Sequence, residues 1–321
     1  MSDLIKTLRD VFGYTSFRPG QEEVINHLIQ KKKLLAVMPT GAGKSLCYQL
    51  PALHFENQTI VVSPLVALMD DQVISLKELG VKAERVHSGM AESKRNQIWK
   101  EFKNKEIKIL YISPESLMRD ELLNALKPLN ISMFVVDEAH CISKWGSDFR
   151  REYELLKELQ NHFPEAIISA FTATADEETR ADINDKLTNG EGKTFLYGFN
   201  RPNLSLSVEQ KTKNWKIQLF EFLMNRKNQS GIVYCLSQKL TEQCAEFLRS
   251  EGFNAYPFHA GLDTQLKIDI QNKFMTEDNV VVCATIAFGM GIDKADVRYV
   301  AHISLPSSVE AFYQEIGRAG R

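Results

Sequence analysis

A loop at residues 38–45 (MPTGAGKS) holds the first side chains that could do chemistry. It follows an apolar run and precedes a helical pattern, which is the context that a phosphate-binding loop needs. Small residues let backbone N–H groups converge on phosphate oxygens, and a helix N-terminus adds the positive end of its dipole. In such a loop Lys44 contacts the β- and γ-phosphates of ATP, and the Ser45 hydroxyl ligates Mg²⁺. The predicted nucleotide-binding residues of this loop are Thr40, Gly41, Ala42, Gly43, Lys44 and Ser45.

Two adjacent carboxylates, Asp137 and Glu138, end the apolar run at residues 133–136. Ligand sites in open α/β sheets lie at the carboxyl ends of strands. Two acids at the end of a buried strand need a cation or a catalytic role to offset their desolvation. The pattern predicts that Asp137 binds Mg²⁺ through water, and that Glu138 orients and deprotonates the attacking water.

Two arginines three residues apart, Arg318 and Arg321, form the third candidate. On one helical turn they would face the same way. Placed across a cleft, they could stabilise negative charge on the transferring phosphoryl group. We expect Arg321 to be less well placed than Arg318, because it is the last residue and chain ends fray.

The elements that must position these groups are predicted to be alternating strands and helices. Strands are predicted at residues 34–38, 59–62, 107–112, 133–136, 167–171, 204–208, 231–234, 280–284 and 299–303. Helical spacing marks residues 4–12, 64–79, 176–187, 237–250 and 264–275. Continuous apolar strands that alternate with helices predict an α/β fold, with parallel sheets covered on both faces.

The length of 321 residues and a break near the middle predict two domains. A turn cluster at residues 189–192 is followed by the turn signal at residues 201–203. We therefore place a first lobe at residues 1–196 and a second lobe at residues 197–321.

Composition excludes several classes of protein. Apolar residues make up 44% and charged residues 25% of the chain, as in soluble globular proteins, and no apolar run could cross a bilayer. The N-terminus does not resemble a secretory signal, so we expect a cytoplasmic protein. The five scattered cysteines form no C-x-x-C pair, which predicts buried thiols and argues against a zinc site or a disulfide framework. The net charge of −2 opposes nucleic-acid binding only weakly, because a groove needs local positive potential.

The three motifs, in this order, resemble those of superfamily 2 helicases, in which two RecA-like lobes sandwich ATP, and further stretches resemble the RecQ family. Residues 12–21 (FGYTSFRPGQ) look like the adenine-recognition motif of that family. This resemblance implies that Tyr14 stacks near the base while Arg18 and Gln21 hydrogen-bond to it. Residues 284–294 (ATIAFGMGIDK) are similar to a motif of the second lobe. There the resemblance implies that Gly289 and Asp293 border the nucleotide, whereas Thr285 lies nearer to DNA.

The resemblance also implies contacts with DNA in the first lobe. Ser63, Pro64 and Ser113 lie in stretches that resemble motifs that touch the DNA backbone. Residues 141–150 (CISKWGSDFR) look like the aromatic-rich loop that is distinctive of RecQ and couples DNA contact to ATP hydrolysis.

Within this aromatic-rich loop, Trp145 and Phe149 offer stacking faces for bases, and Arg150 offers a cation for phosphates. Ser147 stands where the family usually carries histidine, which bears on how efficiently DNA stimulates hydrolysis. Ala42 replaces a usual glycine in the phosphate loop, and we expect little effect because alanine is common there across the superfamily.

The activity that the resemblance implies is ATP- and Mg²⁺-dependent movement 3′ to 5′ on single-stranded DNA, with unwinding of tailed duplexes in recombination and repair. The expected protein is a cytoplasmic monomer of bacterial type, which would then be associated with the nucleoid. RecQ proteins usually continue into zinc-binding and winged-helix modules, so this chain could also be a motor that translocates but needs those modules to unwind. Two rival functions are those of a superfamily 2 RNA helicase or double-strand translocase, and of a scaffold that binds ATP without hydrolysing it.

Overall fold

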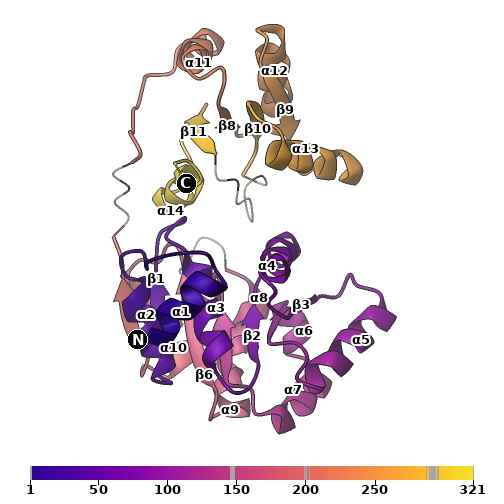
Figure 1. Ribbon diagram of the computed structural model, residues 1–321. Coiled ribbons are helices and arrows are strands. Elements are labelled where there is room, and N and C mark those ends of the chain that lie inside the picture. The colour runs from indigo at the N-terminus through magenta and orange to yellow at the C-terminus, as the bar shows by residue number, and fades with distance from the viewer. Residues whose placement is uncertain are drawn as a thin grey trace. The chain divides into compact units, whose positions relative to one another are not determined.

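The computed structural model describes residues 2–144, 149–198, 201, 203–286, 288, 294 and 296–320. The chain divides by its internal packing into two compact units, Met1–Gly198 and Phe199–Arg321. Each unit is built on its own parallel sheet (Figure 1). The predicted α/β architecture, with two parallel-sheet lobes in tandem, is therefore confirmed over the described residues.

In the described part of the first unit, seven parallel strands form one sheet in the order β3-β4-β2-β5-β6-β1-β7. The strands are β1 (Leu34–Val37), β2 (Thr59–Val62), β3 (Ala83–Val86), β4 (Ile109–Ile112), β5 (Met133–Val136), β6 (Ile167–Thr172) and β7 (Lys193–Leu196). The five inner strands are buried along their whole length, because helices cover both faces of a parallel sheet. The edge strands β3 and β7 instead carry polar residues, which discourage further strand pairing.

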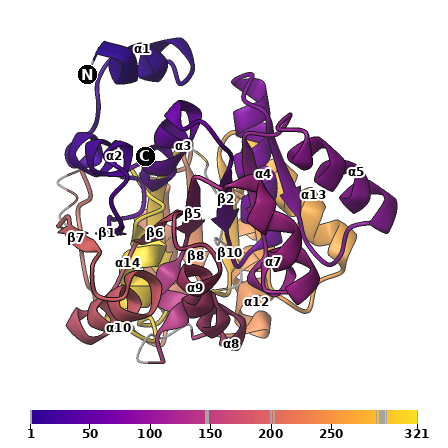
Figure 2. The same ribbon diagram turned by 90° about the horizontal axis from the view of Figure 1, so that it is seen from below.

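Helices lie on both faces of this sheet (Figure 2). On one face, α1 (Ser2–Asp10), α2 (Gln21–Ile29), α3 (Lys44–His54) and α4 (Val66–Glu78) share a core with Leu34 and Ala36 of β1. The opposite face carries α10 (Glu177–Thr188). The smaller elements are α5 (Glu92–Lys103), α6 (Pro114–Leu117), α7 (Asp120–Leu126), η1 (Lys127–Leu129), η2 (Ala139–Ile142), α8 (Arg151–Glu154), η3 (Leu155–Glu158) and α9 (Leu159–His162).

The second unit has four parallel strands in the order β11-β8-β10-β9 among its described residues. They are β8 (Ser230–Tyr234), β9 (Asn254–Phe258), β10 (Val280–Ala284) and β11 (Val297–His302). One apolar cluster joins this sheet to α11 (Trp215–Met224) and α12 (Gln238–Ser250). A second cluster joins the other face to α13 (Thr264–Thr276) and to the turn that follows α14 (Val309–Ile316).

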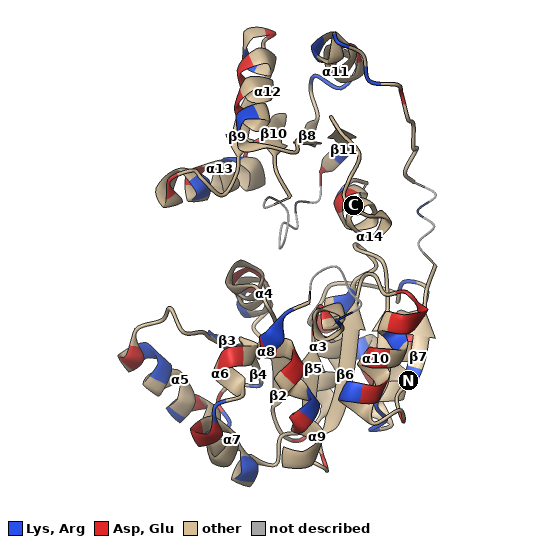
Figure 3. Cartoon of the chain, turned by 180° about the vertical axis from the view of Figure 1, so that it is seen from behind, with Lys and Arg blue, Asp and Glu red and all other residues tan. Residues whose placement is uncertain are grey.

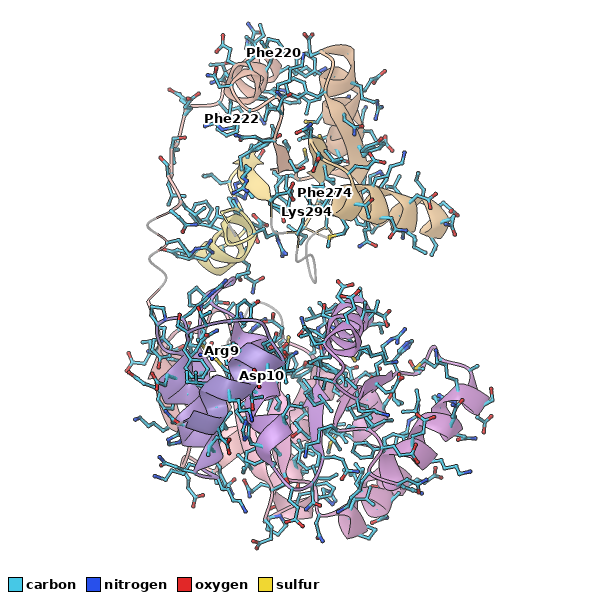
Figure 4. All side chains as sticks on the ribbon, in the orientation of Figure 1. Arg9, Asp10, Phe220, Phe222, Phe274 and Lys294 are labelled. Atoms are coloured by element: carbon cyan, nitrogen blue, oxygen red, sulfur yellow. The ribbon has the colours of Figure 1, made fainter. Side chains whose placement is uncertain are left out.

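Lys294 belongs to the fold of the second unit (Figure 4). Its side chain is 6% exposed, and its Nζ lies 5.7 Å from the centroid of the Phe274 ring. The same Nζ donates to the Glu277 carbonyl at 3.1 Å and pairs with Asp296 at 3.0 Å. These contacts compensate the burial of the charge, so the lysine that ends the second-lobe motif ties the segment before β11 to the C-terminal end of α13.

The predicted elements agree with the structure where the sequence is strongly apolar. The predicted strand at residues 204–208 is wrong: this segment pairs with no described strand and exposes Leu206 and Val208. An alternating pattern alone does not supply a pairing partner. Strands β3, β7 and β9 were not predicted, because polar residues or a proline interrupt their apolar runs. All five cysteines are buried thiols, as predicted.

Gly231 of β8 provides a test of the packing in the second unit. A Cβ at this position would lie 2.2 Å from the ring of Tyr299 on the neighbouring strand β11. Because that ring is itself buried, we expect Gly231→Ala to lower the free energy of unfolding by about 1–3 kcal/mol in urea denaturation. Gly198→Ala is the control, since no atom lies within 4 Å of its added Cβ. Equal unfolding midpoints for the two variants would contradict this account of the packing.

Candidate nucleotide and nucleic-acid site

The loop at residues 38–43 joins the buried strand β1 to the first residue of α3, Lys44. Gly41 and Gly43 have φ values of 83° and 79°, in the left-handed region that residues with a side chain rarely adopt. The loop therefore ends at a helix N-terminus, whose first N–H groups have no partner inside the helix. Lys44 Nζ donates to the Met38 carbonyl at 3.3 Å, so its ammonium group lies against the same loop.

Two residues that the sequence assigns to adenine recognition hold this loop in place. Gln21 is 2% exposed, and its Nε2 donates to the carbonyls of Ala42 at 3.0 Å and Gly43 at 3.2 Å. Its Oε1 accepts from the Arg18 backbone N–H at 2.8 Å, and the Arg18 guanidinium donates to the Gly41 carbonyl. The motif at residues 12–21 is thus bonded directly to the phosphate loop, a link that was not predicted from the sequence.

Asp137 lies at the end of β5, in the middle of the sheet, and is 7% exposed. Its N–H donates to the Val62 carbonyl at 2.9 Å, and its Oδ1 accepts from the Glu138 N–H at 3.0 Å. Burial raises the pKa of Asp137 well above its usual range, and the neighbouring Glu138 carboxylate raises it further, while Lys44 opposes both. A charged Asp137 therefore needs more positive charge than the protein itself provides, which fits the predicted role in binding a divalent cation.

Glu138 has a left-handed backbone, with φ of 48° and ψ of 45°, which is strained for a residue with a side chain. Its Oε2 is buried and accepts no hydrogen bond, although His140 Nδ1 lies 3.4 Å away. That same Nδ1 lies 2.8 Å from the Thr172 hydroxyl at the end of β6. This carboxylate oxygen is buried without a hydrogen-bond partner, on a residue whose backbone is strained. It is therefore suited to bind a group that the protein does not supply, such as an attacking water.

In the second unit, Arg318 lies in the turn that follows α14, which ends at Ile316. The Arg318 N–H still donates to the Glu315 carbonyl at 3.3 Å, three residues earlier, so a helix-like turn continues past the end of α14. Arg318 is 9% exposed and its buried Nε has no hydrogen-bond partner. Burial raises the pKa of Tyr234, and the positive charge of Arg318 partly opposes that rise. A buried guanidinium with a free N–H is a group that an anion could satisfy.

Some of the other predicted site residues lie among the described residues, and some do not. Tyr14 is 52% exposed, so its ring is available for stacking. Thr285 is half-buried after β10, and its N–H donates to the Phe258 carbonyl at 3.1 Å. Four predicted site residues lie outside the described residues, namely Trp145, Gly289, Asp293 and Arg321, and so does Ser147.

The predicted DNA-contacting residues of the first unit follow β2, which pairs with β5, and β4, which lies on the far side of β2. Ser63 and Ser113 are almost fully buried, and the Ser113 hydroxyl bonds to that of Ser116 at 2.9 Å. Because both hydroxyls are buried, we expect a ligand to contact the backbone and the neighbouring residues more than these hydroxyls.

Arg150 Nη1 donates to the Pro64 carbonyl at 3.0 Å, so the aromatic-rich loop is bonded to the segment after β2. Phe149 is 37% exposed, with Lys144 Nζ 5.9 Å from its ring centroid. Along α5 and α12, basic and acidic residues are mixed on the same helix (Figure 3).

Comparison with known proteins identifies the family of this chain. The family model "DEAD/DEAH box helicase" matches residues 18–183, and the model "Helicase conserved C-terminal domain" matches residues 215–321. The ATP-dependent DNA helicase RecQ of Haemophilus influenzae is 45% identical over 317 residues, which cover 99% of this chain and 51% of that protein. The chain belongs to the RecQ family of DEAD/DEAH box helicases.

Further RecQ-family relatives match to a similar extent. The probable ATP-dependent DNA helicase RecS of Bacillus subtilis is 42% identical over 327 residues, covering 100% of this chain and 65% of that protein. The chain spans about half the length of the RecQ helicases of Haemophilus influenzae and Pasteurella multocida. Among the described residues, no helix is both long and apolar enough to cross a membrane.

Solved helicase structures share the fold. The DUF1998 helicase MrfA, bound to DNA and AMPPNP, has a TM-score of 0.80 at 20% identity, covering 99% of this chain and 48% of that one. Dbp5 of Saccharomyces cerevisiae, bound to RNA and ADP BeF3, has a TM-score of 0.74 at 20% identity, covering 100% and 84%. At such identities these likenesses establish the two-lobed fold alone.

Several residues around the site of this RecQ-family chain were not predicted from the sequence. Tyr153 is fully buried and its hydroxyl donates to the Asp137 carbonyl at 3.0 Å. His140 and Thr172 link the end of β5 to the end of β6. A tyrosine close behind the aromatic-rich loop was the available signal for Tyr153, whereas nothing local indicates which strand end His140 meets.

The raised pKa of Asp137 predicts a gain in stability when its charge is removed. A carboxyl whose pKa is raised on folding destabilises the folded state increasingly as the pH rises above its unfolded value of about 4. At pH 8, with metal removed by chelation, we expect Asp137→Asn to raise the melting temperature by a few degrees. The gain should shrink as the pH is lowered towards 5, because the wild-type carboxyl then becomes protonated. Scanning calorimetry against pH measures both effects.

Asp185→Asn is the matched control, because Asp185 is an exposed residue of α10. Its melting temperature should follow that of the wild type at every pH. If Asp137→Asn melted at or below the wild-type temperature at pH 8, burial would not penalise the Asp137 charge as we infer.

Proposed function

We propose that this chain hydrolyses ATP with Mg²⁺ and couples hydrolysis to movement along single-stranded DNA in the 3′ to 5′ direction, unwinding tailed duplexes. The observation that carries the proposal is the pair of adjacent carboxylates, buried Asp137 and half-buried Glu138, on the sheet edge that also carries the phosphate loop. Family membership supports the substrate: relatives over 40% identical are named ATP-dependent DNA helicases. The 3′ to 5′ direction and a role in recombination and repair rest on the resemblance to RecQ.

For hydrolysis, the backbone at residues 40–43 and the Lys44 ammonium would hold the phosphates, with Tyr14, Arg18 and Gln21 on the adenine side. When bound, Mg²⁺ supplies positive charge at the β- and γ-phosphate oxygens, and Ser45 and Asp137 would hold it. Glu138 would orient the attacking water and accept its proton.

The guanidinium of Arg318 would stabilise the charge that develops on the transferring phosphoryl group, and its unpartnered Nε supports that role. We propose the same role for Arg321, and a place beside the nucleotide for Gly289 and Asp293, from their positions in the family motifs.

For DNA, we propose contacts to the sugar–phosphate backbone from Ser63, Pro64, Ser113 and Thr285, stacking by Trp145 and Phe149, and a phosphate contact from Arg150. Such contacts read little sequence and weaken as salt rises, because binding releases counterions from the phosphates. The partly exposed ring of Phe149 beside Lys144 supports a stacking role. We propose further that the chain acts as a monomer in the cytoplasm.

The experiment that tests the proposal is steady-state ATPase with Mg²⁺, alone and with single-stranded DNA or RNA. We expect single-stranded DNA to raise the turnover number more than RNA does, and chelation of Mg²⁺ to abolish turnover. Stronger stimulation by RNA would overturn the choice of DNA. No turnover under any condition would mean a scaffold that binds ATP only.

Unwinding is measured on the same preparation with duplexes that carry a 3′ or a 5′ single-stranded tail. We expect strand separation only with the 3′ tail, which is the loading strand for movement 3′ to 5′. Hydrolysis that DNA stimulates, with separation of neither duplex, would show that this chain moves on DNA but does not itself part the strands. Separation of the 5′-tailed duplex alone would reverse the proposed direction.

Replacing the proposed general base isolates the chemical step. We expect Glu138→Gln to lower the turnover number by about 10²–10⁴-fold, because an amide cannot accept the proton of the attacking water. Affinity for ATP should stay within about twofold, since Glu138 is not proposed to bind the phosphates. Stopped-flow binding of a fluorescent ATP analogue measures that affinity. Glu165→Gln, at an exposed position of the same lobe, is the control, and equal turnover in both variants would remove Glu138 from this role.

A further inference from the structure

Arg201 bonds to the turn that carries Arg318, although the two arginines are more than a hundred residues apart in sequence. Its Nη1 donates to the Gly317 carbonyl at 3.4 Å. Its Nη2 donates to the carbonyls of Ala319 and Gly320, both at 3.0 Å. Three of the carbonyls around Arg318 therefore accept hydrogen bonds from one guanidinium, whose planar fork of N–H donors suits several acceptors at once.

Asn203, two residues after Arg201, holds the same turn. Its Oδ1 accepts from Arg201 Nε at 3.2 Å, and its Nδ2 donates to the Gly320 carbonyl at 2.5 Å. Gly320 has a φ of +66°, and a Cβ there would lie 2.6 Å from Asn203 Nδ2. The turn thus needs glycine at residue 320 both for its backbone conformation and for the close approach of Asn203.

The turn is also fixed to the body of the second unit. Ala319 is 5% exposed within the cluster that contains Ile232 and Val282, and the Gly320 N–H donates to the Val297 carbonyl at 2.9 Å. The core and β11 therefore fix the turn from one side. Arg201 and Asn203 hold it from the chain segment that opens this unit.

We propose that Arg201 is a positioning residue, which holds Arg318 where its guanidinium can reach the transferring phosphoryl group. This inference rests on the role of Arg318 under the proposed function. Arg201 is the third residue of the unit Phe199–Arg321, so the covalent connection from the first unit is bonded almost immediately to the turn. The Arg201 guanidinium bonds to the carbonyls of both neighbours of Arg318, Gly317 and Ala319.

The test is ATPase kinetics of Arg201→Ala with saturating single-stranded DNA. We expect the turnover number to fall by about 10- to 100-fold, the scale of the loss when a catalytic group is misplaced by about 1 Å. The KM for ATP should change by less than about twofold, because Arg201 is not proposed to touch the nucleotide. Arg249→Ala is the matched control. This arginine also donates to a backbone carbonyl of the second unit, that of Ala255, but Ala255 lies on β9 and not in the turn around Arg318. The control variant should retain wild-type turnover.

A double-mutant cycle separates positioning from general support of the fold. Arg318→Ala should lower turnover on its own, and adding Arg201→Ala to it should cause little further loss, because Arg201 acts through Arg318. Losses that multiply in the double variant would overturn the proposal. If Arg318→Ala had wild-type turnover, the proposed role of Arg318 would fail; if it lowered turnover while Arg201→Ala did not, only the positioning role would fail.

Two milder variants keep the test valid if Arg201→Ala does not fold. Arg201→Lys keeps the charge but cannot bond to three carbonyls at once, and Asn203→Ala removes one contact to Gly320. Each should lower the turnover number in the same direction while circular dichroism shows a cooperative thermal transition. Wild-type turnover in both folded variants would overturn the proposal. Tighter binding of ADP with aluminium fluoride by the wild type than by either variant would support it, because that probe mimics the transferring phosphoryl group.

Discussion

Asp137 places a carboxyl group at the end of a strand in the middle of a buried sheet, with the half-buried Glu138 beside it, and the groups around Asp137 offset part of the energetic cost of that placement. An isolated charge in such a place would be neutralised by a shift in its pKa. Asp137 is partly compensated by the Glu138 N–H and by the charge of Lys44. Lys44 can do so because β1 lies close to β5 in the sheet order, separated from it only by β6.

The same sheet edge divides into two regions. The ends of β1, β6 and β5 carry the phosphate loop, Thr172 and the acid pair, while the ends of β2 and β4 carry the segments proposed to meet DNA. A chain of hydrogen bonds joins the regions: the Tyr153 hydroxyl donates to the Asp137 carbonyl, the Tyr153 N–H to the Arg150 carbonyl, and Arg150 Nη1 to the Pro64 carbonyl. A ligand that moved Pro64 or Arg150 would therefore act on the backbone of the acid pair through bonds already present.

The sequence allowed prediction of those features that depend on local pattern. Apolar runs identified most strands, and the glycine loop and acid pair were placed at strand ends because both motifs have a recognisable context. Strands β3, β7 and β9 could not be read in this way, since tertiary pairing makes them strands despite their polar residues. The bonds from Gln21 to the phosphate loop and from Arg201 to Gly317 also escaped prediction. Each joins segments far apart in sequence, and only the fold brings these segments together.

Arg318 is a buried positive charge, whereas Asp137 is a buried acid. In the second lobe, the turn around Arg318 is held rigidly. The buried Nε of Arg318 lacks a partner, which costs free energy in the folded protein. A mobile side chain would relieve that cost by turning to solvent. The turn around it is held by the core contact of Ala319 and by three carbonyl bonds from Arg201, so the backbone of Arg318 has little freedom to move away. A donor that is fixed before the charge develops needs no reorganisation during the reaction, which is the condition under which electrostatic stabilisation of a transition state is strongest.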